Sequence, residues 1–388
     1  MNAPAHIEIS RFPTIEKAIS ALRPTEPLYC LFPQNFQIAA KRFLDGFPGD
    51  AMYAVKANPH PLVLDLVYAA GIRHFDTASL GEVELVKGRF PDAVCHFMAP
   101  VRLPGHAKVA FEKYGVTDYV IDCDFELDKL IAETGHPEKL RVFVRLVTQL
   151  GGALLELSSK FGTDPDETAR LLKRIASLGA APCITFHVGS QCLSSFSYGQ
   201  AIEIARRAID KSGLKIAALD IGGGFPARYN NNDVPPYHWY FDTIREALAT
   251  LERPDLPIYC EPGRALCAEG MSLVTQVVLR KGDRLFINDG TYGSFDELTL
   301  PGWNAEYPNR VFTLDSKNRA LPLPGAIKPF RVYGPTCDTL DVLPRPQMLP
   351  DTIAAGDYIV FDTIGAYSVA VRTTFNGFYP DHWVQIGN

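Results

Sequence analysis

The chain lacks any pair of cysteines at the C-x-x-C spacing, although it contains eight cysteines among 388 residues. Scattered cysteines argue against a disulfide framework or a metal site such as zinc, and they indicate reduced thiols. The sequence also has no apolar run long enough to cross a membrane, and its beginning, MNAPAHIEISRF, lacks the basic and apolar regions of a secretion signal. We therefore expect a cytoplasmic protein that does not bind membranes.

An excess of positive charge is absent as well. Lysine and arginine number 38 against 44 acidic residues, which gives a net charge of −6 at pH 7. This balance argues against a nucleic-acid-binding protein. Repeats and low-complexity segments are also lacking, and a hydrophobic content of 47% is typical of a soluble globular protein. The length suggests two domains, because a single hydrophobic core stops growing beyond roughly 250–300 residues.

What the sequence does contain is a regular alternation of short apolar runs and helix-like segments, from about residue 35 to residue 265. Eight of the runs resemble strands: 52–57, 73–78, 94–99, 118–122, 140–146, 183–189, 216–222 and 257–263. Apolar strands separated by amphipathic helices indicate parallel strands that are covered on both faces. Eight such units predict an α/β fold with a (β/α)₈ barrel, although a doubly wound sheet would show the same pattern.

The character of the sequence changes after residue 266. The later runs are rich in β-branched and aromatic residues and are separated by turn-forming KGD and AGD triplets. Such runs predict a β-rich domain. We therefore predict a barrel over residues 30–266 and a β-rich C-terminal domain over residues 267–388, which residues 1–29 would join.

Polar residues occur where the predicted barrel strands end, and this is where barrels carry their chemistry. These residues are Lys56, Asp76, Asp122, Arg145, His187, Gly222–Gly224 and Glu261. A lysine at such a position usually extends its amine to water, and an aspartate often caps a helix. A buried lysine could instead have a lowered pKa and act as a nucleophile toward a carbonyl group. The ordered combination of a lysine, a histidine, three glycines and a glutamate favours the functional interpretation.

Two glycine-containing motifs predict a site for an anion. DIGGGFP (220–226) follows a strand, and its glycines would let backbone N–H groups approach a phosphate, although a plain tight turn is an alternative. EPGR (261–264) adds Arg264, which can bind phosphate through two hydrogen bonds, and HVGS adds Ser190. A lysine that faces a phosphate cup with a carboxylate nearby is the combination expected for pyridoxal 5′-phosphate.

These motifs occur in order with YAVKAN, FDTAS, SKFG, NDGTYGSF, GPTCDTLD, GAYSVA and FNGF. The set resembles the fold type III (alanine racemase-like barrel) decarboxylases that depend on pyridoxal phosphate. The closest resemblance is to the ornithine/lysine (diamino-acid) decarboxylases, from about residue 28 to residue 380. The resemblance implies decarboxylation of a basic amino acid in polyamine biosynthesis, by a homodimer whose two subunits share each active site.

The resemblance also implies roles for the cofactor-binding residues. Lys56 would hold the cofactor as a Schiff base, His187 would stack on its ring, and Glu261 would pair with the ring nitrogen. The phosphate would be bound by Ser190, Gly223, Gly224, Gly263, Arg264 and Tyr367. The site around the Schiff base would be oriented by Asp76, Glu82 and Arg145.

For the substrate, the resemblance implies residues from the GPTCDTLD and FNGF motifs. Cys337 would enter from the partner subunit and protonate the carbanion, Asp338 would meet the distal amine, and Phe375 would close the pocket, which Tyr367 also lines. A cysteine in such a run is otherwise often a small packed hydrophobe. Lys160 and Asp341 resemble an ion pair that joins the two subunits in the family.

One part of the sequence departs from the family pattern. Ornithine-specific members usually carry an acidic residue shortly after YGSF, at a place that aligns here with Leu300–Pro301. Asp296 or Glu297 could take its role, but we favour the interpretation that both are solvated loop charges. The predicted substrate is therefore of the ornithine or lysine type, with arginine, diaminopimelate or carboxynorspermidine as alternatives.

Other functions fit some of the same motifs. Diaminopimelate decarboxylases share HVGS, GGGF and EPGR, whereas TCDTLD and FNGF favour the diamine enzymes. A racemase would need a second base in place of the cysteine-bearing loop. A relative that regulates a partner without catalysis would not need to keep Lys56, Glu261, Arg264 and Cys337.

Overall fold

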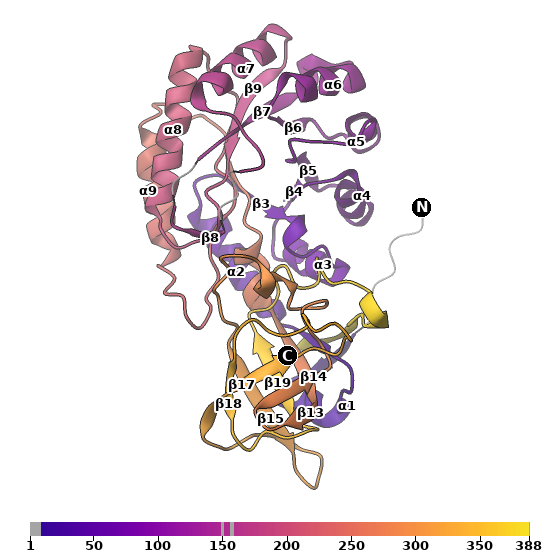
Figure 1. Cartoon of the computed structure of the whole chain (residues 1–388). Coiled ribbons are helices and arrows are strands. Elements are labelled where there is room, and N and C mark those ends of the chain that lie inside the picture. The colour runs from indigo at the N-terminus through magenta and orange to yellow at the C-terminus, as the bar shows by residue number, and fades with distance from the viewer. Residues whose placement is uncertain (1–8, 149–150, 156–158, 388) are drawn as a thin grey trace.

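A computed structural model describes residues 9–148, 151–155 and 159–387 of the chain. Figure 1 shows two parts, a ring of strands and helices above and a compact group of strands below. None of the helices in these described ranges has the length and the apolar composition that a membrane span needs.

The upper part is a closed barrel of parallel strands in the order β11-β12-β3-β4-β5-β6-β7-β9. Its strands are β3 (Asp50–Ala54), β4 (His74–Thr77), β5 (Val94–Phe97), β6 (Asp118–Ile121), β7 (Arg141–Leu146), β9 (Ala181–Phe186), β11 (Leu219–Asp220) and β12 (Ile258–Cys260). Each strand overlaps one of the eight predicted runs. The predicted barrel is therefore confirmed, and the doubly wound alternative is wrong because the sheet closes on itself.

Helices surround this barrel (Figure 1). They are α2 (Pro33–Gly46), α3 (Pro61–Ala69), α4 (Leu80–Arg89), α5 (His106–Tyr114), α6 (Asp124–Thr134), α7 (Pro165–Ser177), α8 (Phe196–Ser212) and α9 (Tyr237–Ala249), with a short α10 (Arg264–Cys267) after β12. Local chemistry fixes their ends. Asp164 caps α7 by accepting hydrogen bonds from two backbone N–H groups, and Gly115, Gly135 and Gly213 end α5, α6 and α8 with positive φ angles.

The lower part is a mixed sheet in the order β1-β20-β2-β13-β14-β17-β18, to which β15, β16 and β19 are attached. Its elements are β1 (Ser10–Phe12), α1 (Ile15–Leu22), β2 (Leu28–Leu31), β13 (Met271–Lys281), β14 (Arg284–Ile287), β15 (Asn309–Leu314), β16 (Ala320–Pro322), β17 (Ile327–Tyr333), β18 (Gln347–Pro350), β19 (Tyr358–Asp362) and β20 (His382–Ile386). The β-rich character predicted for this part is confirmed. The strands β1 and β2 bring described N-terminal residues into the same sheet.

A continuous apolar core joins the barrel to the mixed sheet, with Tyr53 of β3 and Leu273 of β13 in one cluster. Polar contacts cross the same boundary, because Asn58 Nδ2 donates to the Gly365 carbonyl oxygen at 2.8 Å. The backbone N–H of Tyr367 likewise donates to the Ala57 carbonyl oxygen at 2.8 Å. These contacts place a residue of the β-rich part beside the end of β3, where the barrel opens.

Candidate active site

A cavity of about 320 Å³ opens at the carboxyl ends of the barrel strands. Its lining includes most of the predicted cofactor residues: Lys56, Arg145, His187, Ser190, Gly224, Glu261, Gly263, Arg264 and Tyr367. These residues follow different barrel strands, and Tyr367 comes from the β-rich part. Closure of the barrel and its packing against the β-rich part therefore bring together residues as far apart in the sequence as Lys56 and Tyr367.

Lys56 lies in a 3₁₀ turn, η1 (Val55–Ala57), because β3 ends before the lysine, at Ala54. Its Nζ forms an ion pair with Asp76 Oδ2 at the end of β4. Burial alone would lower the pKa of Lys56, but the negative charges of Asp76 and Glu261 outweigh burial and raise the pKa above its usual value. The suggestion of a lowered pKa is therefore wrong for the site without cofactor, in which the lysine is a cation.

Glu82 supports this arrangement from α4. The backbone N–H of Ala78 donates to Glu82 Oε2 at 2.6 Å, which fixes the turn that follows β4. Burial raises the pKa of Glu82, and Asp76 adds to the shift. Glu82 thus holds the chain next to Asp76, the ion-pair partner of Lys56.

Glu261 follows β12 and is 4% exposed. Burial and the neighbouring negative charge of Asp220 raise the pKa of Glu261 well above its usual value. Asp220 is held in turn by the Thr185 hydroxyl and the Gly222 N–H, at 2.7 and 2.9 Å. Glu261 Oε1 has no hydrogen-bond partner among the described residues. It is a buried acceptor beside the cavity. 

The sequence motifs did not identify Asp220 as a neighbour of Glu261. Its position could have been noticed, since it is the acidic residue that opens DIGGGFP. Asp220 ends β11, which pairs with β12, so it lies beside the strand that leads into Glu261. 

His187 lies close to the glycine turn. A Cβ atom at Gly223 would come within 2.9 Å of His187 Nε2, so only glycine fits there. Burial lowers the pKa of His187 well below its usual value, and the positive charges of Arg145 and Lys56 add to the shift. The Gly189 N–H donates to His187 Nδ1 at 3.0 Å. The imidazole is therefore neutral, which suits a ring that stacks on another ring.

Arg264 is almost completely enclosed, with 4% of its surface exposed. Its Nη2 donates to Ser190 Oγ at 3.2 Å, and its Nη1 donates to Tyr229 Oη at 2.8 Å. Its Nε has no hydrogen-bond partner among the described residues. Gly224 lies nearby with φ +102°, and a Cβ atom there would meet the Gly189 carbonyl oxygen at 2.4 Å. The glycine keeps the backbone open toward the cavity.

Two of the unpartnered buried atoms in the described residues belong to residues that line this cavity, and they provide a test for the expected cofactor. Glu261 Oε1 is a buried acceptor, and Arg264 Nε is a buried donor. Pyridoxal 5′-phosphate has a ring N–H that needs an acceptor and a phosphate that needs donors. A buried polar group without a partner is costly, so both atoms call for a ligand of this kind. The residues present fit the cofactor.

The predicted substrate residues form a separate group on the β-rich part. The Cys337 N–H donates to Asn376 Oδ1 at 3.0 Å, and the rings of Tyr292 and Phe375 lie 4.7 Å apart. The Tyr292 hydroxyl donates to Asp338 Oδ2. Cys337 is exposed to solvent. The structure brings these residues together, but of the predicted substrate residues only Tyr367 lines the cavity that contains Lys56 of the same chain, among the residues that the structure describes.

Asp341 does not have the exposure expected of an intersubunit partner. It is 2% exposed, and its carboxylate accepts hydrogen bonds from the N–H groups of Thr291 and Thr336 at 2.8 and 3.0 Å. These hydrogen bonds hold the loop that carries Cys337 in place. Little of the Asp341 carboxylate is therefore exposed for the predicted ion pair with Lys160. Lys160 is exposed, and its Nζ lies 4.9 Å from the centre of the Phe161 ring.

The interpretation of Glu297 as a solvated charge is wrong. Glu297 lies in the short 3₁₀ turn η4 (Asp296–Thr299), is 2% exposed, and forms a bidentate ion pair with Arg264. Asp296 next to it is half-buried, and Leu300 is exposed. The signal in the sequence was ambiguous, because a loop after YGSF gives no periodicity from which burial can be read.

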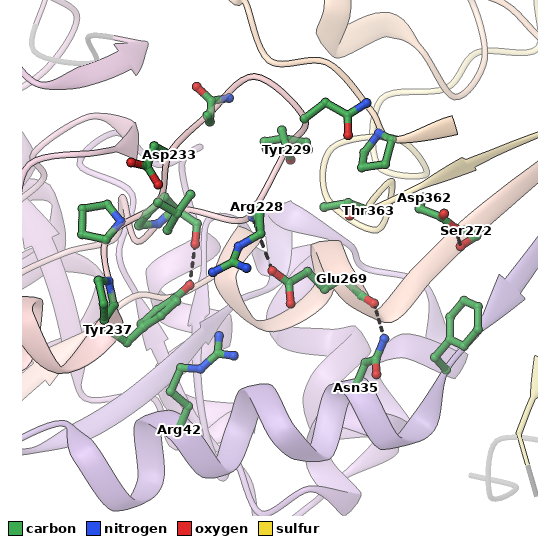
Figure 2. Close-up of a pocket in the computed structure, with 18 residues that line it drawn as sticks. Asn35, Arg42, Arg228, Tyr229, Asp233, Tyr237, Glu269, Ser272, Asp362 and Thr363 are labelled. Atoms are coloured by element: carbon green, nitrogen blue, oxygen red, sulfur yellow. Dashed lines mark hydrogen bonds between the residues drawn. The ribbon is translucent and has the colours of Figure 1, made fainter. Parts of the chain in front are cut away.

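A larger cavity, of about 1000 Å³, lies between α2, the loop before α9 and the β-rich part. Figure 2 shows its residues, with the side chains of Arg42 and Arg228 directed toward the same hollow. None of the predicted cofactor or substrate residues lines it. Tyr229, which lines this larger cavity, accepts a hydrogen bond from Arg264, which lines the cavity that contains Lys56. Size alone therefore does not identify the functional cavity.

Comparisons with known proteins agree with this geometry. A family model described as the pyridoxal binding domain of pyridoxal-dependent decarboxylases matches residues 34–268. The lysine/ornithine decarboxylase of Selenomonas ruminantium is 35% identical over 84% of this chain and 81% of that protein. The structure of a Paramecium bursaria Chlorella virus arginine decarboxylase bound to agmatine is similar, with a TM-score of 0.83, 27% identity, and coverage of 96% of this chain and 99% of that chain. A lysine/ornithine decarboxylase from Vibrio vulnificus complexed with cadaverine has a TM-score of 0.82 and 28% identity, and the match covers 97% and 99% of the two chains.

Proposed function

Because this chain belongs to the ornithine/lysine decarboxylase family of pyridoxal-dependent enzymes, we propose that it decarboxylates ornithine or lysine to a diamine for polyamine biosynthesis. The observation that carries the proposal is the pair of buried, unpartnered atoms at the cavity, Glu261 Oε1 and Arg264 Nε, together with the amine of Lys56. Bound pyridoxal 5′-phosphate supplies an electron sink for the electron pair that remains when CO₂ leaves.

The residues around the ring would prepare this site. Lys56 would hold the cofactor, and Asp76 keeps the amine of Lys56 in place through their ion pair. Glu261 would hold a proton at the ring nitrogen, which requires a carboxylate in a site shielded from water. His187 is neutral and would lie against the ring without adding charge.

The residues around Arg264 would bind the phosphate. This phosphate-binding group consists of Ser190, Gly223, Gly224, Gly263, Arg264 and Tyr367. Its side chains and glycine backbone would hold the phosphate end of the cofactor, and Lys56 in its 3₁₀ turn would hold the other end. Tyr367 has a φ angle of +53°, an uncommon conformation for a non-glycine residue that is consistent with a functional position.

We further propose that the protein is a homodimer and that the partner subunit completes each active site. Among the described residues that line the cavity of one chain, Glu261 is the only carboxylate. Cys337 and Asp338 lie beside exposed apolar side chains, with Leu340 73% exposed and Phe378 44% exposed. Apolar side chains gathered at one place on the surface favour packing against another chain. Cys337 would then supply the proton to the α-carbon, and Asp338 would bind the distal amine.

A screen of CO₂ release tests this function and the substrate together. Ornithine, lysine, arginine, diaminopimelate and carboxynorspermidine are supplied separately to the enzyme with its cofactor. We expect the highest kcat/KM with ornithine or lysine, because Asp338 would bind the distal ammonium group that both substrates carry. Release from diaminopimelate alone would contradict the proposal. If a visible absorbance that borohydride abolishes is present but no substrate releases CO₂, a regulatory binding protein is the better explanation.

A further inference from the structure

The guanidinium group proposed to bind the cofactor phosphate already has a carboxylate partner. Arg264 Nη1 donates to Glu297 Oε2 at 3.0 Å, and Arg264 Nη2 pairs with Glu297 Oε1. The hydroxyl of Tyr307 also donates to Glu297 Oε2, at 3.4 Å. Arg264 is 4% exposed and Glu297 is 2% exposed. Both charges are thus removed from water, so each depends on the other for neutralisation.

Glu297 is not needed to orient Arg264. Tyr229 and Ser190 accept hydrogen bonds from its two Nη atoms at 2.8 and 3.2 Å. The guanidinium carbon also lies 4.4 Å from the centre of the Trp303 ring and 4.9 Å from that of Tyr367. These contacts hold the plane of the guanidinium from several sides. What Glu297 alone contributes is a negative charge.

The remaining donor of Arg264 determines what else this group can bind. Its Nε is buried and lacks a hydrogen-bond partner in the described part of the chain. A phosphate monoester carries between about −1.5 and −2 charges at pH 7. A phosphate bound by Arg264 would therefore share one guanidinium with a carboxylate, and like charges in a buried site repel strongly.

We propose that Glu297 is a resident counter-charge for Arg264. In the cofactor-free protein Glu297 neutralises the guanidinium, and it weakens the binding of the cofactor phosphate. The inference rests on the proposed role of Arg264 as the phosphate ligand. One consequence of this counter-charge is that the protein tolerates the loss of its cofactor, but binds the cofactor with lower affinity. A second consequence is that Glu297 is already engaged and does not serve the distal amine of the substrate.

The test compares two variants that each neutralise a buried acid paired with an arginine. Glu297→Gln removes the charge in the cup. Glu126→Gln is the control, because Glu126 is 4% exposed, lies 3.3 Å from buried Arg102 and 2.5 Å from Lys129, and does not line the cavity. The thermal midpoint Tm is measured for each protein without cofactor and with saturating pyridoxal phosphate. The cofactor Kd is measured by titration, followed by protein fluorescence.

We expect Glu297→Gln to lower the Tm of the cofactor-free protein and to enlarge the rise in Tm that pyridoxal phosphate causes. The Kd should fall by about tenfold, because a repelling charge is removed. Inorganic phosphate should also stabilise this variant more than the wild type. Glu126→Gln should lower Tm to the same extent with and without cofactor and leave the Kd unchanged. Glu297→Asp, which keeps the charge, should have a Kd near that of the wild type.

Weaker cofactor binding in Glu297→Gln, or equal losses of Tm with and without cofactor, would overturn the inference and make Glu297 an ordinary structural partner of Arg264. If Glu297→Gln folds only with cofactor present, its rate of cofactor loss on dialysis replaces the titration, and slower loss than in the wild type is expected. Wild-type protein that binds no pyridoxal phosphate would refute the proposed function itself. Wild-type binding without tightening in Glu297→Gln would refute this inference alone.

Discussion

The two ends of the barrel both contain buried charged groups, but they differ in how these groups are paired. Near the amino ends of the strands, His74 Nδ1 lies 2.9 Å from His96 Nε2, and His96 Nδ1 lies 2.6 Å from Asp118 Oδ2. Arg141 Nε donates to Asp118 Oδ1 at 2.7 Å, and Arg141 Nη1 donates to the Tyr259 hydroxyl at 2.9 Å. At the carboxyl ends, Lys56, Glu261 and Arg264 line a cavity.

The unpartnered atoms separate the two ends. In the described part of the chain, the amino-end network contributes none of the buried side-chain atoms that lack a hydrogen bond, whereas Glu261 and Arg264 each contribute one. An apolar cluster connects the ends, since Met98 also lines the cavity and Tyr259 also bonds to Arg141. Buried charge is therefore compatible with a purely structural role. An unpartnered donor or acceptor at a cavity is the more specific sign of a ligand site.

The largest expected effect on activity comes from removing the carboxylate of Glu261, at the carboxyl ends of the strands. Glu261→Ala should lower kcat by on the order of 10³-fold, because the ring nitrogen would lose the group that keeps it protonated. The cofactor should stay bound through Lys56 and the phosphate site. Steady-state kinetics and the cofactor absorbance measure the two properties separately. Turnover like that of the wild type would remove Glu261 from its proposed role.

Cys337→Ala tests whether the acid is a residue that does not line the described cavity of its own chain. Loss of the proposed acid should lower kcat by about 10²-fold or more, or divert the product, because proton transfer by a placed side chain contributes that much. Product analysis by mass spectrometry accompanies the rate measurement. The exposed Cys123 offers a control, since Cys123→Ala should leave rate and product unchanged. An unchanged rate and product for Cys337→Ala would show that Cys337 takes no part in catalysis.

Mixing two variants tests whether each active site is shared between two subunits. Lys56→Ala and Cys337→Ala would each be nearly inactive alone. After subunit exchange, about a quarter of wild-type activity should return, because random pairing leaves one intact site in half of the dimers. Mass spectrometry of intact dimers shows whether exchange has occurred. Demonstrated exchange without recovered activity would contradict shared active sites.

The carboxyl end could be predicted from the sequence to a larger extent than the amino end. Lys56, His187 and Glu261 end or follow apolar runs, so their place in a barrel follows from the spacing of the runs. Asp118 and His96 lie within such runs, and spacing does not show which side chains of neighbouring strands meet. Glu297 was missed for a similar reason. Its burial depends on Arg264, which is 33 residues away in the sequence, and on packing that no local pattern encodes.

A substitution in the network at the amino ends of the strands should affect activity less but should lower stability strongly. Asp118 is 2% exposed, and although burial opposes its ionisation, the bonds from His96 and Arg141 keep its pKa below the usual value. Asp118→Asn should lower the free energy of unfolding by about 3–5 kcal/mol, because it leaves a charged partner uncompensated. Urea unfolding measures this loss. The kcat per folded molecule should remain that of the wild type, and a large fall in kcat would couple the two ends.

The smallest expected effect concerns pH and His74. Burial lowers the pKa of His74 below its usual value, and the neighbouring His96 adds to the shift. The unfolded chain therefore binds a proton near pH 6.5 that the folded chain does not bind, so stability is lost as the pH falls from about 7.5 toward 5. His74→Gln keeps a donor for His96 but does not titrate, and it should make the fall in Tm over this range shallower. The exposed His238 is the control, since His238→Gln should leave the slope as in the wild type. Equal slopes for all three proteins would show that His74 titrates alike in both states and contributes nothing to the acid sensitivity over this range.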